Sequence, residues 1–184
     1  MREEYMAAQI ICIVGKKQAG KTTFLEKLIP ELQALGVSVG AVKHDAHSFD
    51  IDRKGKDSWR LKQAGAETVV VSSPDRIAMI KSVDHDLTLD EMARSLFADK
   101  HLMITEGYFN SDHPKIEIHR SDAHNRPLCN RANQTEKKLV AMVTDRGVDA
   151  DVPKFELDDA KGVAAHIARS YLGWVHNRMW DGQD

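Results

Sequence analysis

Nine consecutive residues combine glycine, lysine and threonine in an order suited to binding phosphate. They follow the apolar run 10–14 and are Gly15, Lys16, Lys17, Gln18, Ala19, Gly20, Lys21, Thr22 and Thr23. A glycine-bounded turn between a strand and a helix directs several backbone N–H groups at one position, where the helix dipole also favours negative charge. Lys21 adds an ammonium group, and Thr22 adds a hydroxyl suited to Mg²⁺. The sequence therefore predicts a phosphate-binding loop (P-loop) that works with Mg²⁺.

Two acidic residues are candidates to complete a magnesium site at this loop. Asp45 follows the apolar stretch 37–42, and Glu106 follows the run 101–105. If both stretches are strands of one parallel sheet, both carboxylates lie at the edge that carries the P-loop. Mg²⁺ in such sites takes one or two carboxylates together with substrate phosphates. We therefore assign Thr22, Asp45 and Glu106 as the metal-binding candidates.

The same two acids, Asp45 and Glu106, are the catalytic candidates. Either carboxylate could hold Mg²⁺, directly or through water, and either could orient an attacking water. The sequence leaves this assignment open, and it also leaves open that either residue is a capping or solvated acid at a strand end.

A third acid is a candidate to bind a nucleobase. Asp145 follows the apolar stretch 139–143, where guanine-nucleotide P-loop proteins carry a carboxylate that accepts hydrogen bonds from guanine. The complete Asn-Lys-x-Asp signature of those proteins is absent from the sequence. Asp145 is therefore either a guanine-binding residue or a turn residue.

The apolar pattern around the P-loop predicts an α/β fold. The run 9–14 is a strand, and residues 24–35 repeat apolar side chains at helical spacing before Gly36, a typical helix C-cap. A second strand at 37–42 completes a strand–helix–strand unit, whose crossover is right-handed. Pro30 lies inside the helix, so we expect a bend there or packing that outweighs a cost of about 3 kcal/mol.

The remaining elements are typical of a mostly parallel, twisted sheet with flanking helices. Expected strands are 68–72, 77–80, 101–105, 115–119 and 139–143, and expected helices are 57–64, 88–97 and a final helix capped by Asp158. The alternating segment 115–119 favours a half-exposed edge strand that could pair between subunits. The polar segment 121–138 is expected to be a mobile loop. We predict a single P-loop NTPase-type domain over 1–184, with its core at about 9–172 and some antiparallel edge strands.

Composition narrows the class of protein. The chain has 184 residues, of which 42% are hydrophobic and 29% charged, and no apolar run reaches the roughly 20 residues of a membrane span. Its net charge of −2 gives no electrostatic case for nucleic acid, although residues 53–62 are locally basic. Residues 1–9 lack a secretory pattern, and Cys12 and Cys129 are far apart. We therefore expect a cytoplasmic protein without membrane or nucleic-acid partners.

Short motifs spread between residues 10 and 172 accompany the P-loop. They are Lys43-His44-Asp45, Phe49-Asp50-x-Asp52, Gly55-Lys56-Asp57-Ser58-x-Arg60, Ala64-Gly65-Ala66, Ser72-Ser73-Pro74, Glu106-Gly107 and Pro114-Lys115-Ile116-Glu117. In combination they resemble the MobB family, the molybdopterin-guanine dinucleotide biosynthesis adaptor proteins. The sequence departs from the family's pattern at His101, where members commonly have Asp, and in the basic P-loop interior.

The resemblance implies a P-loop protein that binds GTP and Mg²⁺ and assists the attachment of GMP to molybdopterin. The implied partners are the molybdopterin guanylyltransferase that performs the transfer, molybdopterin or its guanine dinucleotide, and a second copy of the chain in a homodimer. The resemblance also implies weak intrinsic GTP hydrolysis, as an accessory to the transferase.

Two alternative functions remain open from the sequence. A small-molecule kinase would need an arginine-rich lid, for which Arg120, Arg126 and Arg131 are the candidates. A non-catalytic module would bind nucleotide on the P-loop only to stabilise a dimer.

Overall fold

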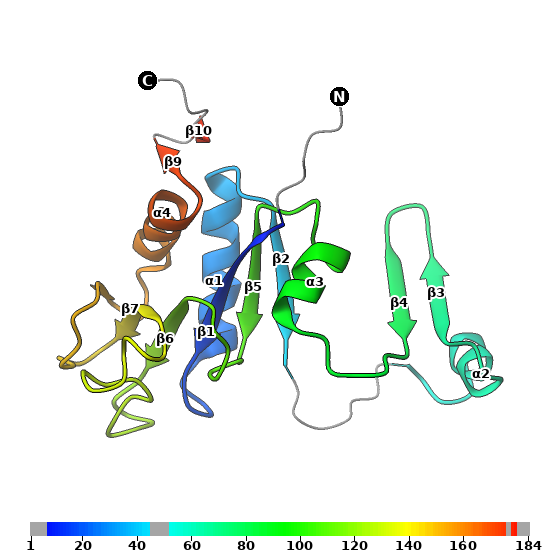
Figure 1. The fold of residues 1–184 in the computed structure, drawn as a ribbon, viewed down its shortest axis with the longest axis horizontal. Helices are drawn as coiled ribbons and strands as arrows, with labels where there is room; N and C mark the ends of the chain where they lie inside the picture. The colour runs from blue at the N-terminus through cyan, green and yellow to red at the C-terminus, as the bar shows by residue number, and fades with distance from the viewer. Residues whose placement is uncertain (1–6, 45–51, 176–177, 180–184) are drawn as a thin grey trace. The chain divides into compact units, whose positions relative to one another are not determined.

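The computed structural model describes residues 7–44, 52–175 and 178–179. The chain divides into two compact units, one of residues 1–44 and 89–184 and the other of residues 45–88. Figure 1 shows the strands and helices of both units. No helix in the described residues is long and apolar enough to cross a membrane.

The first unit is built on a sheet in which six described strands all run parallel, in the order β2-β5-β1-β6-β7-β8. These strands are β1 (Gln9–Val14), β2 (Val39–Lys43), β5 (Leu102–Glu106), β6 (Lys115–His119), β7 (Leu139–Thr144) and β8 (Lys154–Phe155). Near-continuous apolar runs in β1 and β5 are buried, as central strands covered on both faces require. The predicted α/β class with a mostly parallel sheet is confirmed.

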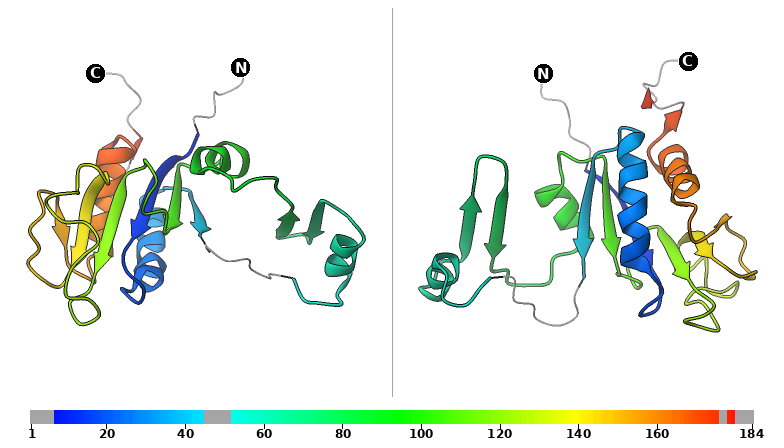
Figure 2. Two further views of the ribbon diagram at one scale, coloured as in Figure 1. Left: turned by 60° about the horizontal axis from the view of Figure 1, so that its bottom comes forward. Right: turned by 180° about the vertical axis from the view of Figure 1, so that it is seen from behind.

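Helices cover both faces of this sheet. The helices α1 (Lys21–Ala34) and α4 (Ala160–Tyr171) pack together on one face, and α3 (Leu89–Leu96) lies on the other (Figures 1 and 2). Leu28 and Leu32 of α1 are fully buried against the sheet. Pro30 stands on the exposed side of α1 and the helix continues through it, because the buried leucines on either side outweigh its cost.

Strand β6 differs from the predicted half-exposed edge strand. It pairs with β1 on one side and β7 on the other, and all five of its residues are buried. Its polar side chains bond to loop backbone: Lys115 Nζ donates to the carbonyls of Ser111 and His113, and the Glu117 carboxylate accepts from two backbone N–H groups. The prediction of an edge strand that pairs between subunits is therefore wrong, because satisfied buried polar groups produced the same alternation as solvent exposure.

The start of α4 differs from the prediction by one residue. Asp159 is the N-cap, and its Oδ1 accepts from the backbone N–H of Gly162 at 2.8 Å. The predicted cap, Asp158, lies one residue earlier. Two short strands, β9 (Trp174–Val175) and β10 (Arg178–Met179), form an antiparallel pair after this helix.

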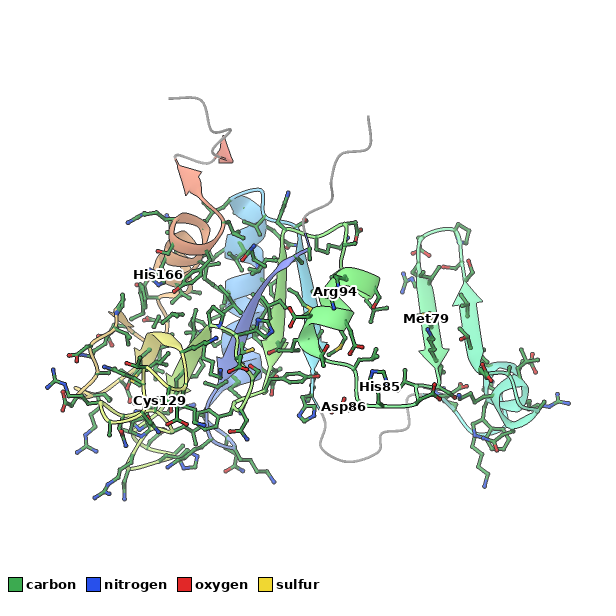
Figure 3. All side chains as sticks on the ribbon, in the orientation of Figure 1. Met79, His85, Asp86, Arg94, Cys129 and His166 are labelled. Atoms are coloured by element: carbon green, nitrogen blue, oxygen red, sulfur yellow. The ribbon has the colours of Figure 1, made fainter. Side chains whose placement is uncertain are left out.

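The second unit contains α2 (Asp57–Gln63) and an antiparallel hairpin of β3 (Thr68–Ser72) and β4 (Ile77–Lys81). The antiparallel strands that we expected at the edge of the main sheet thus form separate two-stranded sheets. Much of the hairpin's apolar surface is exposed, including 73% of Ile77 and 49% of Met79, which Figure 3 labels on β4.

Candidate functional site

The P-loop forms a tight turn between β1 and α1 at the carboxyl end of the sheet. Gly15, Gln18 and Gly20 have positive φ angles of 149°, 65° and 89°. A Cβ atom at Gly15 would overlap the carbonyl oxygen of Ile118, so only glycine fits where the loop passes the end of β6. The strained backbone of Gln18, a non-glycine residue, is typical of ligand-binding loops.

Lys21 lies folded back across this loop. Its Nζ donates hydrogen bonds to the carbonyl oxygens of Gly15 at 3.0 Å and of Lys16 at 3.1 Å. The ammonium group is thus held over the turn that presents the backbone N–H groups. Phosphate oxygens are stronger acceptors for an ammonium than neutral carbonyls are, so this position suits an anionic ligand.

Thr22 and Glu106 meet beside the loop. Thr22 Oγ1 donates a hydrogen bond to Glu106 Oε2 at 2.7 Å. The parallel pairing of β5 with β1 matches Glu106 to Ile13, and the backbone N–H of Gly107 donates to the Ile13 carbonyl. A hydroxyl and a carboxylate side by side, next to the P-loop turn, are oxygen donors of the kind that Mg²⁺ prefers.

The other acidic candidate for this site, Asp45, lies outside the described residues. The strand that precedes it, β2, pairs with β5 in the parallel sheet. His44, the last described residue before Asp45, donates its backbone N–H to the carbonyl of Glu106. The centroid of the His44 ring lies 4.5 Å from the centroid of the Tyr108 ring. Among the described residues, Glu106 is therefore the candidate acid that lies beside the Thr22 hydroxyl of the P-loop.

Asp145 holds the chain that leaves β6. Its Oδ1 accepts from the backbone N–H of Ser121 at 2.9 Å, and this hydrogen bond holds the pKa of the Asp145 carboxyl below its usual value. The structure therefore gives this exposed side chain a contact to loop backbone next to Arg120.

Two histidines that the sequence did not single out fasten the same loop to the P-loop. His124 Nε2 donates to the carbonyl of Lys17 at 2.6 Å. His119 Nε2 faces the carbonyl of His124 at 2.9 Å, which requires a proton on that nitrogen and leaves Nδ1 to accept from the Thr144 hydroxyl. The contacts of His124 with Lys17 and of His119 with Thr144 have no local sequence signal, because they join residues 107 and 25 positions apart.

A cavity of about 240 Å³ opens beside the P-loop, between α1, the end of β6 and the connection from β8 to α4. Its polar and charged lining comes from Gly20, Thr23, Lys27, Arg120 and Asp158. The Arg120 Nε is buried and has no hydrogen-bond partner in the described part of the chain. Sequence reasoning missed this cavity, since three separate segments form it.

Comparisons with known proteins agree with one another. A family model described as "Molybdopterin guanine dinucleotide synthesis protein B" (MobB) matches residues 10–145. The chain is 31% identical to a molybdopterin-guanine dinucleotide biosynthesis adapter protein of Haemophilus influenzae, over 91% of this chain and 90% of that protein. It is 34% identical to the adapter protein of Escherichia coli, over 80% of this chain and 85% of that protein.

The fold has solved counterparts as well. A crystal structure of molybdopterin-guanine biosynthesis protein B superposes with a TM-score of 0.66 and 28% identity, covering 87% of this chain and 97% of that one. Bacillus subtilis MobB superposes with a TM-score of 0.65 at 24% identity, which supports the fold. The resemblance found in the sequence motifs is thereby confirmed, and the chain belongs to the MobB family.

Proposed function

We propose that this protein is a GTP-binding adaptor that assists the attachment of GMP to molybdopterin, with weak Mg²⁺-dependent GTP hydrolysis. The observation that carries the proposal is the hydrogen bond between Thr22 and Glu106 beside a lysine-bearing P-loop. The relatives named as adapter proteins in molybdopterin-guanine dinucleotide biosynthesis supply the pathway.

The P-loop residues bind the nucleotide phosphates in this proposal. Backbone N–H groups of the turn 15–20 and the ammonium of Lys21 hold the anionic oxygens. Thr22 Oγ1 and Glu106 Oε2 hold Mg²⁺, which neutralises phosphate charge when it is bound. Asp45 stays a second candidate, both as a metal ligand and as the acid that orients water.

The kinase alternative is disfavoured by the contacts of two of its three candidate lid arginines, Arg120 and Arg131. Arg131 pairs with Asp149 at 3.3 Å and Asp151 at 2.6 Å, and Arg120 pairs with Asp122 at 2.8 Å. Arg131 is paired with the connection between β7 and β8, and Arg120 with its own loop, so the two arginines are poorly placed to form a shared lid over a transferred phosphoryl group.

The partners follow from the pathway and from the second unit. The proposed partners are a molybdopterin guanylyltransferase and molybdopterin or its guanine dinucleotide. Residues 53–62 carry five cations and one acid, Asp57, so this segment of the unit suits an anionic partner.

A homodimer is part of the proposal and is supported by the exposed hairpin. Val70, Val71, Ile77 and Met79 are each about half exposed or more. An isolated two-stranded hairpin is marginally stable in water. A second copy of the chain that packed on this hairpin would bury its apolar surface.

A cytoplasmic location also belongs to the proposal, because Cys12 and Cys129 are both free thiols.

The test follows GTP hydrolysis with Mg²⁺, with and without the purified guanylyltransferase, in the wild type, Glu106→Gln and the control Glu31→Gln. The proposal expects slow hydrolysis that falls at least roughly tenfold in Glu106→Gln and is unchanged in Glu31→Gln. It also expects the wild type to raise the yield of guanine dinucleotide from the transferase. Unchanged transfer together with equal hydrolysis in all three proteins would contradict it.

A further inference from the structure

The geometry points to a nucleobase site in the cavity beside the P-loop, where the Asp158 carboxylate selects guanine and the Arg120 guanidinium stacks on the ring. This inference rests on the proposed GTP-binding function. It assigns guanine recognition to Asp158, in the connection from β8 to α4, in place of Asp145, after β7.

The cavity continues directly from the phosphate-binding turn. Ala19 and Gly20 belong to the P-loop and also line the cavity. Thr23 and Lys27 are one helical turn apart on α1 and line it further along. A nucleotide with its phosphates in the loop can therefore place its base there. The volume of about 240 Å³ is below the roughly 300–1,000 Å³ of pockets for drug-sized ligands, and it suits a single ring system.

The Asp158 carboxylate is available to a ligand. The N-cap hydrogen bond of α4 is made by Asp159, so Asp158 is not engaged in capping. The Asp158 side chain is exposed, lines the cavity, and makes no hydrogen bond or ion pair with another described residue. An ionised carboxylate accepts hydrogen bonds and donates none.

Guanine and adenine respond differently to such an acceptor. Guanine presents two donors on one edge, its N1–H and its exocyclic amine, and these complement a carboxylate. Adenine presents an acceptor, N1, at the corresponding position, so its lone pair would face the carboxylate oxygens. Lys27 adds a cation of the kind that donates to O6 and N7 of guanine.

Arg120 supplies a flat surface for the ring. Its Cδ lies 3.6 Å from the position of a Cβ at Gly20, so the side chain runs along the P-loop wall of the cavity. Its Nη2 pairs with Asp122 at 2.8 Å, which fixes one end of the guanidinium. Planar guanidinium groups stack on nucleobases, whereas an ammonium offers only a point charge.

Asp145 has a positioning role in this arrangement. It accepts from the backbone N–H of Ser121, the residue that follows Arg120. Asp145 thus holds the backbone that carries Arg120, and its effect on a bound base is indirect.

The test measures binding of GTP, ATP and xanthosine triphosphate to the full chain by calorimetry with Mg²⁺. The variants are Asp158→Asn, Asp145→Asn, Arg120→Lys and the control Glu156→Gln, which lies in the same connection. Asp158 is exposed, so the substitution leaves the core unchanged, and a melting curve checks the fold.

Asp158→Asn should weaken GTP by roughly ten- to a hundredfold and strengthen xanthosine triphosphate, because an amide can donate to the carbonyl that replaces the guanine amine. Arg120→Lys should weaken GTP and ATP by similar factors, and Glu156→Gln should match the wild type. A GTP preference that survives in Asp158→Asn would overturn the inference while leaving GTP binding intact. A change of preference to xanthosine triphosphate in Asp145→Asn, and not in Asp158→Asn, would overturn it in the same way. A wild type that binds no nucleotide would overturn the proposed function as well.

Discussion

Thr22 Oγ1 donates to Glu106 Oε2 over 2.7 Å, although the two residues are 84 positions apart in the chain. The contact arises because β5 pairs with β1 in parallel, so both strands end at the edge where the P-loop turns into α1. The hydroxyl and the carboxylate are therefore already adjacent, and a metal ion would not need to assemble them.

Removing the Thr22 hydroxyl should make the affinity for GTP less dependent on Mg²⁺. Thr22→Ala deletes one proposed metal ligand, whereas Thr22→Ser retains the oxygen. We expect Mg²⁺ to strengthen GTP binding to the wild type and to Thr22→Ser, and to have an effect roughly tenfold smaller in Thr22→Ala. Titrations with and without excess EDTA measure this ratio. An alanine variant with the full Mg²⁺ effect would exclude Thr22 as a ligand.

Removing the ammonium should weaken phosphate binding itself. Lys21→Ala removes the cation that donates to the carbonyls of Gly15 and Lys16. We expect GTP affinity to fall at least about tenfold, since hydrogen bonds to charged groups contribute about 1.5–3 kcal/mol. Lys161→Ala, on the exposed surface of α4, is the matched control and should bind like the wild type. Equal affinities of the two variants would argue against phosphate binding at this loop.

The P-loop and its flanking elements could be predicted from local sequence alone. The apolar run of β1, the glycines and the helical spacing of α1 each act over a few residues, and Gly36 adopts the expected positive φ of 87°. The placement of the ends of β2 and β5 at the edge that carries the P-loop followed from the general rule for parallel sheets.

Non-local contacts explain what the sequence did not predict. Lys115 and Glu117 suggested a solvent-exposed strand face because their backbone partners lie on loops that local patterns cannot place. The two-residue strand β8 is too short to give a periodic signal. The cavity depends on Arg120 and Asp158, which lie on different segments and come together only in the folded chain.

Glu117 should be important for stability through the loop that it binds. Its carboxylate accepts from the backbone N–H groups of Leu128 at 2.6 Å and Cys129 at 2.7 Å, and burial raises its pKa. Glu117→Ala leaves two donors unsatisfied, each costing about 1–3 kcal/mol, whereas Glu117→Gln keeps one acceptor oxygen. Urea unfolding should therefore show a larger loss for alanine than for glutamine. Equal losses would contradict this account of the loop.

His166 should make stability depend on pH below neutrality. It lies on α4 (Figure 3). Burial of its ring lowers its pKa from the usual 6.5, against the opposing effect of a hydrogen bond with the Val140 backbone. The unfolded chain then binds more protons than the folded one just below pH 6.5, so the free energy of unfolding falls as the pH drops through that value.

The measurement for His166 is urea unfolding of the wild type and His166→Leu at several pH values between 5 and 8. We expect the wild type to lose more stability than the variant on acidification. A wild type and variant whose stabilities run parallel across this range would exclude His166 as the source of the dependence.

The exposed hairpin gives a test of the dimer. Ile77→Lys places a charge on its most exposed apolar residue and should produce monomers by light scattering if two copies pack there. Leu96→Lys, on α3 in the other unit, changes a residue with 46% exposure and serves as the control. Dimers that persist in Ile77→Lys would place the interface elsewhere, and a monomeric wild type would remove the dimer from the proposal.

The most direct test of the central claim is the calorimetric affinity of the wild-type chain for GTP and for ATP in the presence of Mg²⁺. A GTP-binding adaptor should bind GTP at least about tenfold more tightly than ATP, which corresponds to about 1.4 kcal/mol. Equal affinities for the two nucleotides, or binding of neither, would contradict the account.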